Sequence, residues 1–216
     1  MSVFAGDNLA CVRGERMVFC GLDFHLEAGA ALVLLGPNGS GKSSLLRLMA
    51  GLLRPAAGRL AWDGAGLEED REAHAGRLHY VGHLDAVKPV LSVAENLAFW
   101  AGLRAPPAGA GQRVEAALAR FGLTSLAGLP ARFLSAGQRR RLALARIAAT
   151  PAPLWLLDEP TAALDDASVA RLTEVIAGHR AGGGMVVVAT HGGLDLPGAA
   201  ALALDRFAAL DSEAAT

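Results

Sequence analysis

The chain has 216 residues, which is enough for one or two compact domains with a hydrophobic core. Its formal net charge of −1 gives no general attraction to nucleic acid or anionic lipid. No apolar run approaches the ~20 residues that a membrane-spanning helix needs, and residues 1–8 lack the basic start and apolar stretch of a secretory signal. We therefore expect a cytosolic protein.

The N-terminal part of the chain predicts strands around one glycine-rich loop. Residues 7–27 alternate apolar and polar around Gly14-Glu15, which predicts a hairpin. Residues 30–35 are a short, continuous apolar run, as expected of a strand buried on both faces. The loop 36–41 follows this run and leads into a helix. We also predict strands at 59–62 and 78–82, and the polar segment between them, 64–76, is expected to lie on the surface.

The middle of the chain predicts a helical insertion, and strands and helices alternate again after it. The helices of the insertion, at about 85–150, are expected at 93–103, at 113–121 and from a cap at Ser135 to about Ala149, with a Pro/Gly-rich separator at 105–111. Afterwards we expect strands at 154–157, 185–189 and 199–204, a helix at 165–180 and a mobile polar tail. This alternation predicts an α/β fold with a parallel sheet and crossover helices.

Residues 36–43, Gly-Pro-Asn-Gly-Ser-Gly-Lys-Ser, fit the phosphate-loop pattern GxxxxGK[ST] between a predicted strand and a predicted helix. Glycines let successive backbone N–H groups turn toward phosphate oxygens, and a helix N-terminus adds positive potential. We expect Lys42 to reach the β- and γ-phosphates of ATP and Ser43 to bind Mg²⁺. The alternative is a chance glycine-rich turn. The predicted ATP-binding residues here are Gly36, Pro37, Asn38, Gly39, Ser40, Gly41, Lys42, Ser43 and Ser44.

An apolar run at 154–157 ends in two carboxylates, Asp158 and Glu159. In phosphate-loop ATPases, an aspartate at this place lies near Mg²⁺, and we expect Asp158 to bind the ion through water. Glu159, one residue further, is expected to polarise the attacking water as the catalytic base. Two adjacent acids also occur as an ordinary helix cap, but the phosphate loop earlier in the chain favours the catalytic interpretation.

Residues 134–138, Leu-Ser-Ala-Gly-Gln, complete this set, and with them the chain resembles the nucleotide-binding subunits of ABC transporters over essentially its whole length. They match the LSGGQ signature motif, with Ala136 in place of a glycine. The resemblance implies one ATP-binding domain over 1–216: a P-loop NTPase core, an N-terminal antiparallel β piece and a helical subdomain. It also implies that two ATP molecules lie between head-to-tail copies, each contacted by the other copy's Ser135, Ala136, Gly137 and Gln138.

Two further positions match landmarks of that family. Asp165 ends a segment, Ala-Ala-Leu-Asp, that matches the D-loop, and the resemblance implies that it lies on the dimer seam. His191 follows the predicted strand at 185–189 and matches the switch histidine. There it would hydrogen-bond the γ-phosphate and order the water beside Glu159. A histidine after a strand is more often structural, but its position here favours a catalytic role.

Two positions depart from the family's common pattern. His83 stands where the Q-loop glutamine is expected, and its imidazole can make one hydrogen bond near Mg²⁺ or its water. A loop histidine that couples the two subdomains is the alternative. The aromatic residue that usually stacks on adenine is missing from residues 11–17. Arg13 or Arg16 can stack through guanidinium instead, or be exposed to solvent.

Three consecutive arginines, Arg139, Arg140 and Arg141, follow the signature motif. Consecutive residues point around a helix rather than along one face, and the chain is close to neutral, so we do not predict a nucleic-acid-binding patch. We predict instead a helix surface that faces solvent, the partner subunit or phosphate.

Within the family, several details resemble the ATP-binding subunit of the haem exporter in cytochrome c maturation. These are Gly82-His83, Lys88, the run LSAGQRRR, residues 154–160 and the three glycines at 182–184. Leu84 departs from it, because glutamine commonly follows the histidine. The resemblance implies an ATPase at the cytoplasmic face of the inner membrane, with integral permease subunits and haem-handling proteins as partners. It would drive haem export or the release of a haem-loaded chaperone.

Three other functions stay open from the sequence. The first is an ABC ATPase that serves a transporter for another small molecule. The second is a soluble ABC ATPase that acts on DNA or ribosomes, although the chain has none of the coiled coils, zinc inserts or tandem domains typical of that class. The third is a regulatory ATP sensor without turnover, which the presence of Glu159 and His191 disfavours.

Overall fold

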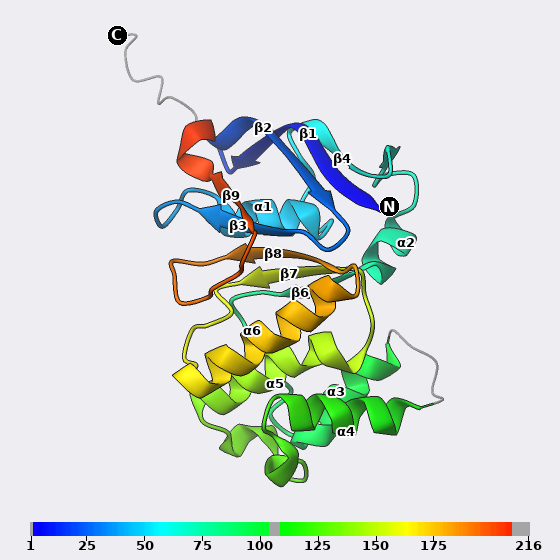
Figure 1. Ribbon diagram of the computed structural model, residues 1–216. Coiled ribbons are helices and arrows are strands. Elements are labelled where there is room, and N and C mark those ends of the chain that lie inside the picture. The colour runs from blue at the N-terminus through cyan, green and yellow to red at the C-terminus, as the bar shows by residue number, and fades with distance from the viewer. Residues whose placement is uncertain (1, 104–108, 209–216) are drawn as a thin grey trace.

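The computed structural model describes residues 2–103 and 109–208. Within them the chain forms two sheets and a group of helices that are stacked as layers (Figure 1). Part of the predicted separator at 105–111 and most of the predicted polar tail lie outside the described residues. None of the helices in the described ranges has the length and apolar character that crossing a bilayer requires.

An antiparallel sheet, built chiefly from the N-terminal residues, forms one outer layer (Figure 1). Its strands, in the order β2-β1-β4-β5, are β1 (Val3–Arg13), β2 (Arg16–Glu27), β4 (Ala57–Trp62) and β5 (Ala65–Gly66). Gly14 turns the chain between β1 and β2 with a φ of 62°, a conformation that glycine adopts without steric cost. The predicted hairpin is confirmed, and it is longer than predicted because β1 begins at Val3.

The second sheet is parallel, as predicted. Its strands, in the order β6-β7-β8-β3-β9, are β3 (Ala31–Leu35), β6 (Leu78–Val81), β7 (Leu154–Asp158), β8 (Met185–Ala189) and β9 (Ala200–Ala203). In β7, Leu154 and Leu156 belong to one hydrophobic cluster, whereas Trp155 and Leu157 belong to another on the opposite face. Because both faces are buried, such strands appear in the sequence as continuous apolar runs.

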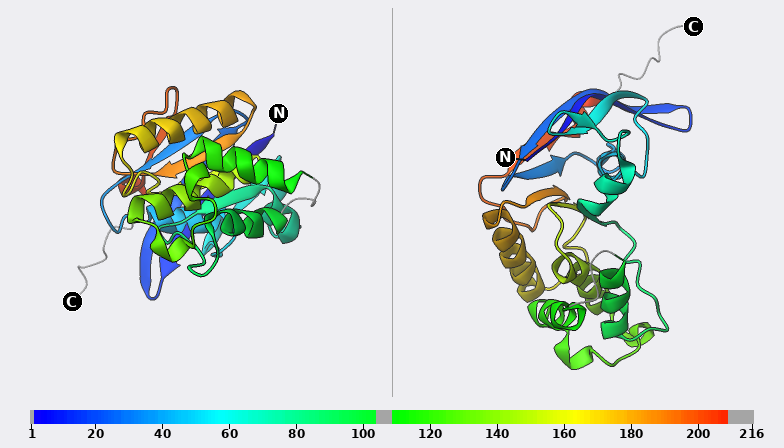
Figure 2. Two further views of the ribbon diagram at one scale, coloured as in Figure 1. Left: turned by 90° about the horizontal axis from the view of Figure 1, so that it is seen from below. Right: turned by 90° about the vertical axis from the view of Figure 1, so that its right-hand side faces the viewer.

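The helices cover the parallel sheet on both faces. They are α1 (Lys42–Met49), α2 (Arg71–Gly76), α3 (Val93–Gly102), α4 (Ala110–Arg120), α5 (Ala136–Ala149) and α6 (Asp166–Ala181), with short 3-10 helices at Thr124–Leu126, Ala131–Phe133 and Leu204–Phe207. α1 lies between the two sheets, and α5 and α6 lie on the other face of the parallel sheet (Figure 1). α3 and α4 pack on α5 at the end of the molecule away from the antiparallel sheet (Figure 2).

The segment predicted as a polar surface excursion, 64–76, contains α2 and a buried histidine, so that prediction is wrong in part. His74 is 4% exposed. Trp62 Nε1 donates to His74 Nδ1 at 2.9 Å, which leaves Nε2 as the protonated nitrogen, and Nε2 lies 3.0 Å from Met49 O. α2 is therefore fixed to β4 and α1 by buried hydrogen bonds rather than by an apolar stripe that the sequence would reveal.

The carboxyl ends of four adjacent strands meet at one edge of the parallel sheet, because β6, β7, β8 and β3 are neighbours with the same direction. The segments that follow these strands contain His83, Glu159, His191 and the phosphate loop. In open parallel sheets, ligands bind outside the carboxyl ends of the strands. The fold therefore brings segments from four distant parts of the sequence to one candidate site.

Candidate functional site at the carboxyl edge of the sheet

The phosphate loop connects β3 to the N-terminus of α1 and leaves little room for side chains. Gly41 has a φ of 102°, and a Cβ placed on it would lie 2.7 Å from Val18 Cγ1. Lys42 Nζ donates to Gly36 O at 2.7 Å and to Pro37 O at 3.0 Å, so the ammonium group lies over the loop. This close backbone, a lysine and a helix N-terminus form an arrangement suited to binding phosphate.

A cavity of about 510 Å³ opens beside this loop. Its walls bring together predicted site residues from all four strand ends and both candidate adenine-stacking arginines: Arg13, Arg16, Val18, Asn38, Gly39, Gly41, Lys42, Ser43, Ser44, His83, Asp158, Glu159 and His191. Gly36, Pro37 and Ser40 shape the loop without lining the cavity. Val18 was not predicted, because an apolar residue in a strand carries no chemical signal in a sequence.

Ser43 and Asp158 form a pair suited to Mg²⁺. Ser43 Oγ donates to Asp158 Oδ1 at 3.1 Å, and Asp158 is 2% exposed. In the described part of the chain, no group hydrogen-bonds the buried Oδ2 of Asp158. A buried carboxylate oxygen without a partner is costly unless a cation or an ordered water satisfies it. A hydroxyl and a carboxylate are also the oxygen ligands that Mg²⁺ prefers, so these residues fit that ion.

Glu159 and His191 lie side by side in the wall of the cavity. His191 Nε2 is 3.4 Å from Glu159 Oε1. The chain leaves β7 at Glu159 with a φ of 45°, a left-handed conformation that costs a non-glycine residue about 1–2 kcal/mol. Its N–H donates to Ala189 O on β8 at 2.9 Å. Strained residues of this kind occur preferentially at functional sites, where the surrounding structure holds them in place.

The signature residues begin α5 and lie apart from this cavity. Ser135 and Gln138 form a capping box, because Gln138 N donates to Ser135 Oγ at 3.2 Å and Ser135 N donates to Gln138 Oε1 at 2.8 Å. The predicted cap at Ser135 is therefore confirmed. Among the described residues that line the cavity, none belongs to 135–138. The N-terminus of α5 therefore lies outside this cavity, with Ser135 and Ala136 exposed.

The predicted D-loop packs against the signature residues. A Cβ placed on Gly137 would lie 2.7 Å from Ala163 O, whereas Ala136 is exposed. Asp165 caps α6 by accepting a hydrogen bond from Ser168 N at 2.8 Å, and hydrogen bonding to Ser168 lowers the pKa of Asp165. The alanine in this chain's signature thus stands at the position with space for a methyl group, and the glycine stands where backbone approaches closely.

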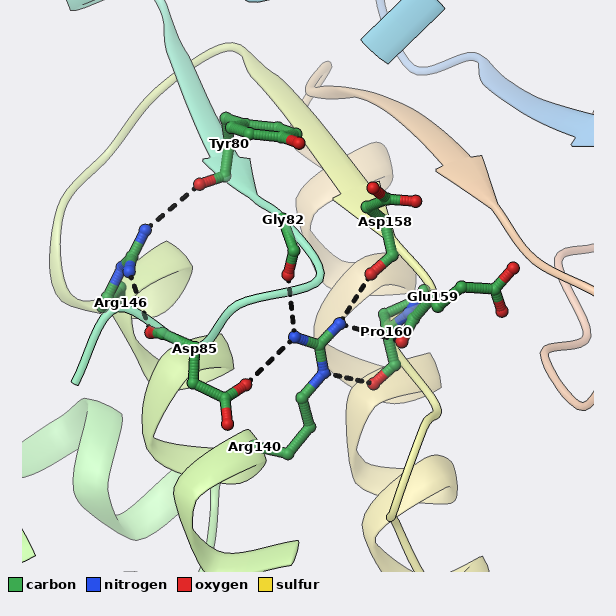
Figure 3. Close-up of polar contacts among 8 residues, drawn as sticks. All are labelled: Tyr80, Gly82, Asp85, Arg140, Arg146, Asp158, Glu159 and Pro160. Carbon is green, nitrogen blue, oxygen red and sulfur yellow. Dashed lines mark hydrogen bonds and ion pairs between the residues drawn. The ribbon is translucent and has the colours of Figure 1, made fainter. Parts of the chain in front are cut away.

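Of the three consecutive arginines, Arg140 contradicts the predicted helix surface. Arg140 is 4% exposed, whereas Arg139 and Arg141 are partly exposed. The guanidinium of Arg140 donates to the backbone carbonyls of Asp158 and Glu159 and forms an ion pair with Asp85 at 3.2 Å (Figure 3). The burial of Arg140 follows from helical geometry: three consecutive residues point in different directions around α5, so one of them faces the interior.

Comparison with known proteins identifies the family. A family model described as ABC transporter matches residues 19–162. The chain is 65% identical over 208 residues to the cytochrome c biogenesis ATP-binding export protein CcmA of Paramagnetospirillum magneticum, covering 96% of each chain. It is 64% identical over 215 residues to the protein of the same name from Rhodospirillum rubrum, covering 99% of this chain and 91% of that one.

Solved structures share the fold at low sequence identity. The structure of an ATP-binding subunit of an ABC transporter aligns with a TM-score of 0.81 at 23% identity, covering 88% of this chain and 79% of that one. An ABC transporter ATP-binding protein from Pyrococcus furiosus aligns with a TM-score of 0.80 at 22% identity, covering 95% of this chain and 99% of that one. The chain therefore belongs to the ABC transporter family, within the group of cytochrome c biogenesis ATP-binding export proteins.

Proposed function

We propose that this chain is the ATP-hydrolysing subunit of an ABC complex in cytochrome c biogenesis, where it powers haem export or the release of a haem-loaded chaperone. The observation that carries the proposal is that Lys42, Glu159 and His191 line one cavity at the carboxyl edge of a parallel sheet. High identity to two proteins named as cytochrome c biogenesis ATP-binding export proteins supports the choice of pathway.

ATP binds with its phosphates on the loop between β3 and α1. Backbone N–H groups of the loop and the N-terminus of α1 donate toward the phosphate oxygens, and Lys42 adds a positive charge. Ser43 would bind Mg²⁺ and Asp158 would hold the ion through water, and the buried Oδ2 of Asp158, which has no hydrogen-bond partner among the described residues, supports this assignment. When bound, the ion neutralises charge on the phosphates. Arg13 and Arg16, which also line the cavity, stack on or lie beside the adenine.

Hydrolysis requires a base beside the γ-phosphate, and Glu159 supplies it. Its carboxylate accepts a proton from water while the water oxygen forms a bond to the γ-phosphorus and the bond to the leaving ADP oxygen breaks. His191 donates a hydrogen bond to the γ-phosphate and keeps the water beside Glu159, an assignment that its 3.4 Å distance from Glu159 supports. His83 takes the place of the Q-loop glutamine at the wall of the same cavity.

A second copy of the chain completes each ATP site. The position of residues 135–138 outside the chain's own cavity supports a head-to-tail dimer, in which the signature of one copy contacts the ATP bound to the other. The exposed N-terminus of α5 presents its positive end to the γ-phosphate. Asp165 lies on the seam between the copies. Each chain works as one ATP-binding domain over 1–216, with residues 85–150 as its helical subdomain.

The dimer works at the cytoplasmic face of the inner membrane, as a peripheral subunit. Its partners are integral permease subunits, and haem-handling proteins lie beyond them. ATP binding closes the dimer and hydrolysis opens it, and this cycle moves the membrane helices. Nucleic acid is not a partner, since the net charge of −1 supplies no general attraction to phosphate backbones.

Replacing Glu159 with glutamine tests the proposal. Glu159→Gln keeps the side-chain size but removes the base, so we expect hydrolysis to fall by about 10²–10⁴-fold and an ATP-bound dimer to accumulate. Phosphate release and size-exclusion chromatography in ATP measure the two effects. Glu174→Gln, on α6 and away from the nucleotide cavity, is the matched control. A Glu159→Gln chain that stayed monomeric in ATP and hydrolysed it normally would rule out the catalytic assignment.

The same variant tests the pathway in cells. When Glu159→Gln replaces the chromosomal copy, we expect c-type cytochromes to be lost while b-type haemoproteins remain, because haem synthesis itself is not affected. Haem-stained gels of membranes and difference spectra separate the two classes. Normal c-type cytochromes would instead favour an ABC ATPase that serves another small molecule.

A further inference from the structure

Arg140 lies one turn inside α5, and its side chain reaches the end of β7, where the proposed base Glu159 follows. Its Nη2 donates to Asp158 O at 2.7 Å and to Glu159 O at 2.8 Å, and its Nε donates to Pro160 O at 3.4 Å (Figure 3). These carbonyls belong to the last residue of β7 and the two residues after it, where the strand ends. A planar guanidinium with donors in a fixed fork can satisfy several such acceptors at once.

These bonds fix the backbone that carries the proposed base. Glu159 has left-handed backbone geometry, with its N–H bonded to Ala189 O and its carbonyl bonded to Arg140. Both polar groups of its main chain are therefore held: the N–H by β8, and the carbonyl by Arg140 of α5 together with Ala162 N, which donates to it at 3.2 Å. The carboxylate that this backbone carries lies 3.4 Å from His191 Nε2.

The same guanidinium holds the loop that follows β6. Arg140 Nη1 donates to Gly82 O at 3.0 Å and to Asp85 Oδ1 at 3.2 Å, on either side of His83 (Figure 3). Arg146, further along α5, donates to Tyr80 O at 3.1 Å. α5 thus hydrogen-bonds to the segment that follows β6 and contains the cavity-lining His83. Arg140 joins this segment to the end of β7.

We infer that Arg140 is a positioning residue for ATP hydrolysis, which holds Glu159 and the His83 loop in register with the helix that begins at the signature motif. The inference rests on the proposed role of Glu159. Arg140 is buried and does not line the nucleotide cavity, so it acts through the backbone of other residues rather than on ATP. A shift of the signature helix, such as one caused by the partner's ATP, is transmitted by Arg140 to this chain's own base.

Arg140→Lys tests the inference in the full-length chain. Lysine keeps the positive charge, but its ammonium cannot donate at once to the loop after β6 and to the end of β7, as the guanidinium does. We expect kcat for ATP hydrolysis to fall about tenfold or more, because small misplacements of a catalytic group are costly, while Kd for ATP changes little. The thermal unfolding midpoint falls as well, because lysine leaves some of the buried carbonyls without a donor. Arg141→Lys is the matched control: Arg141 also donates to two carbonyls, those of Phe121 and Gly122, away from the site.

A double variant separates positioning from general support of the fold. If Arg140 acts mainly through Glu159, then adding Arg140→Lys to Glu159→Gln lowers ATP hydrolysis by a smaller factor than Arg140→Lys alone lowers it. An additional loss equal to that of Arg140→Lys would overturn the inference, as would an unchanged kcat in the single variant or a loss of ATP affinity as large as the loss of kcat. Normal hydrolysis by Glu159→Gln would instead overturn the proposed function, so the two failures are distinguishable.

Discussion

Gly137 and Ala136 show how the signature segment separates two requirements at adjacent residues. Ala136 is exposed at the start of α5, where a methyl group meets solvent. Gly137 faces the D-loop, and an added Cβ would come within 2.7 Å of Ala163 O, a backbone atom that cannot rotate away. The glycine at 137 is therefore required by packing between the signature helix and the D-loop, whatever it contributes to phosphate binding.

Gly137→Ala is expected to lower ATP hydrolysis about tenfold or more, because the D-loop or the start of α5 must move to accommodate the methyl group. Phosphate release at saturating ATP measures the effect. Gly111→Ala is the control, since Gly111 also lies in the first turn of a helix, but a Cβ added there would meet no other part of the described chain within 4 Å. Equal activities of the two variants would show that the contact with Ala163 has no functional weight.

Residues that carry chemistry were predictable where a short motif contains them. Lys42, Asp158 and Glu159 each stand in a local pattern of strand, loop and polar residue, and the structure brings them into one cavity. Arg140 carries no such motif, because its partners are carbonyl groups whose positions depend on the tertiary fold. The signal that was available is its spacing to Leu144 and Ile147, which places all three on the buried face of α5.

At the scale of elements, α2 shows where a pattern of polar residues misleads. Its sequence contains no apolar stripe, yet it is fixed by the imidazole of His74 between Trp62 and Met49 O. Burial lowers the pKa of His74, with smaller opposing and reinforcing effects from Met49 and Arg77. Protonation would place a second N–H against the Trp62 N–H, so the packed form of α2 requires the neutral ring.

This contact predicts a pH-dependent stability. Because the pKa of His74 in the folded chain lies below the ordinary histidine value of 6.5, the unfolded chain binds the proton first as pH falls. The stabilisation is complete above about pH 6.5 and decreases below it. In His74→Gln, whose amide can donate to Met49 and accept from Trp62, we expect the unfolding midpoint to vary less with pH below 6.5 than in the parent chain.

Urea unfolding at a series of pH values measures both slopes. His179 has a pKa lowered by burial too, so part of the dependence remains in the variant, and His179→Gln serves as the comparison. Parallel slopes in the parent chain and His74→Gln would show that His74 does not carry the linkage.

At the scale of the whole molecule, the sequence predicted a parallel sheet but not the order of its strands. Leu78 pairs with Leu154, and that register joins segments separated by the helices α3, α4 and α5. An apolar run predicts that a strand is buried on both faces, but it does not predict which strands lie beside it, because all such runs are alike in character. The strand order is known only from the structure, whereas the helices of the insertion followed from periodicity and caps within each segment.

The separation of the signature from the chain's own cavity leads to the last prediction. In the Glu159→Gln background, Ala136→Asp adds a negative charge at an exposed helix N-terminus, where it favours the helix itself but repels a partner's phosphates. We expect ATP to bind each monomer with unchanged affinity while the ATP-dependent dimer disappears from size-exclusion profiles. Gln112→Asp places the same charge in the first turn of α4 and should leave the dimer intact. A dimer that survived Ala136→Asp would mean that the partner's ATP does not lie against α5.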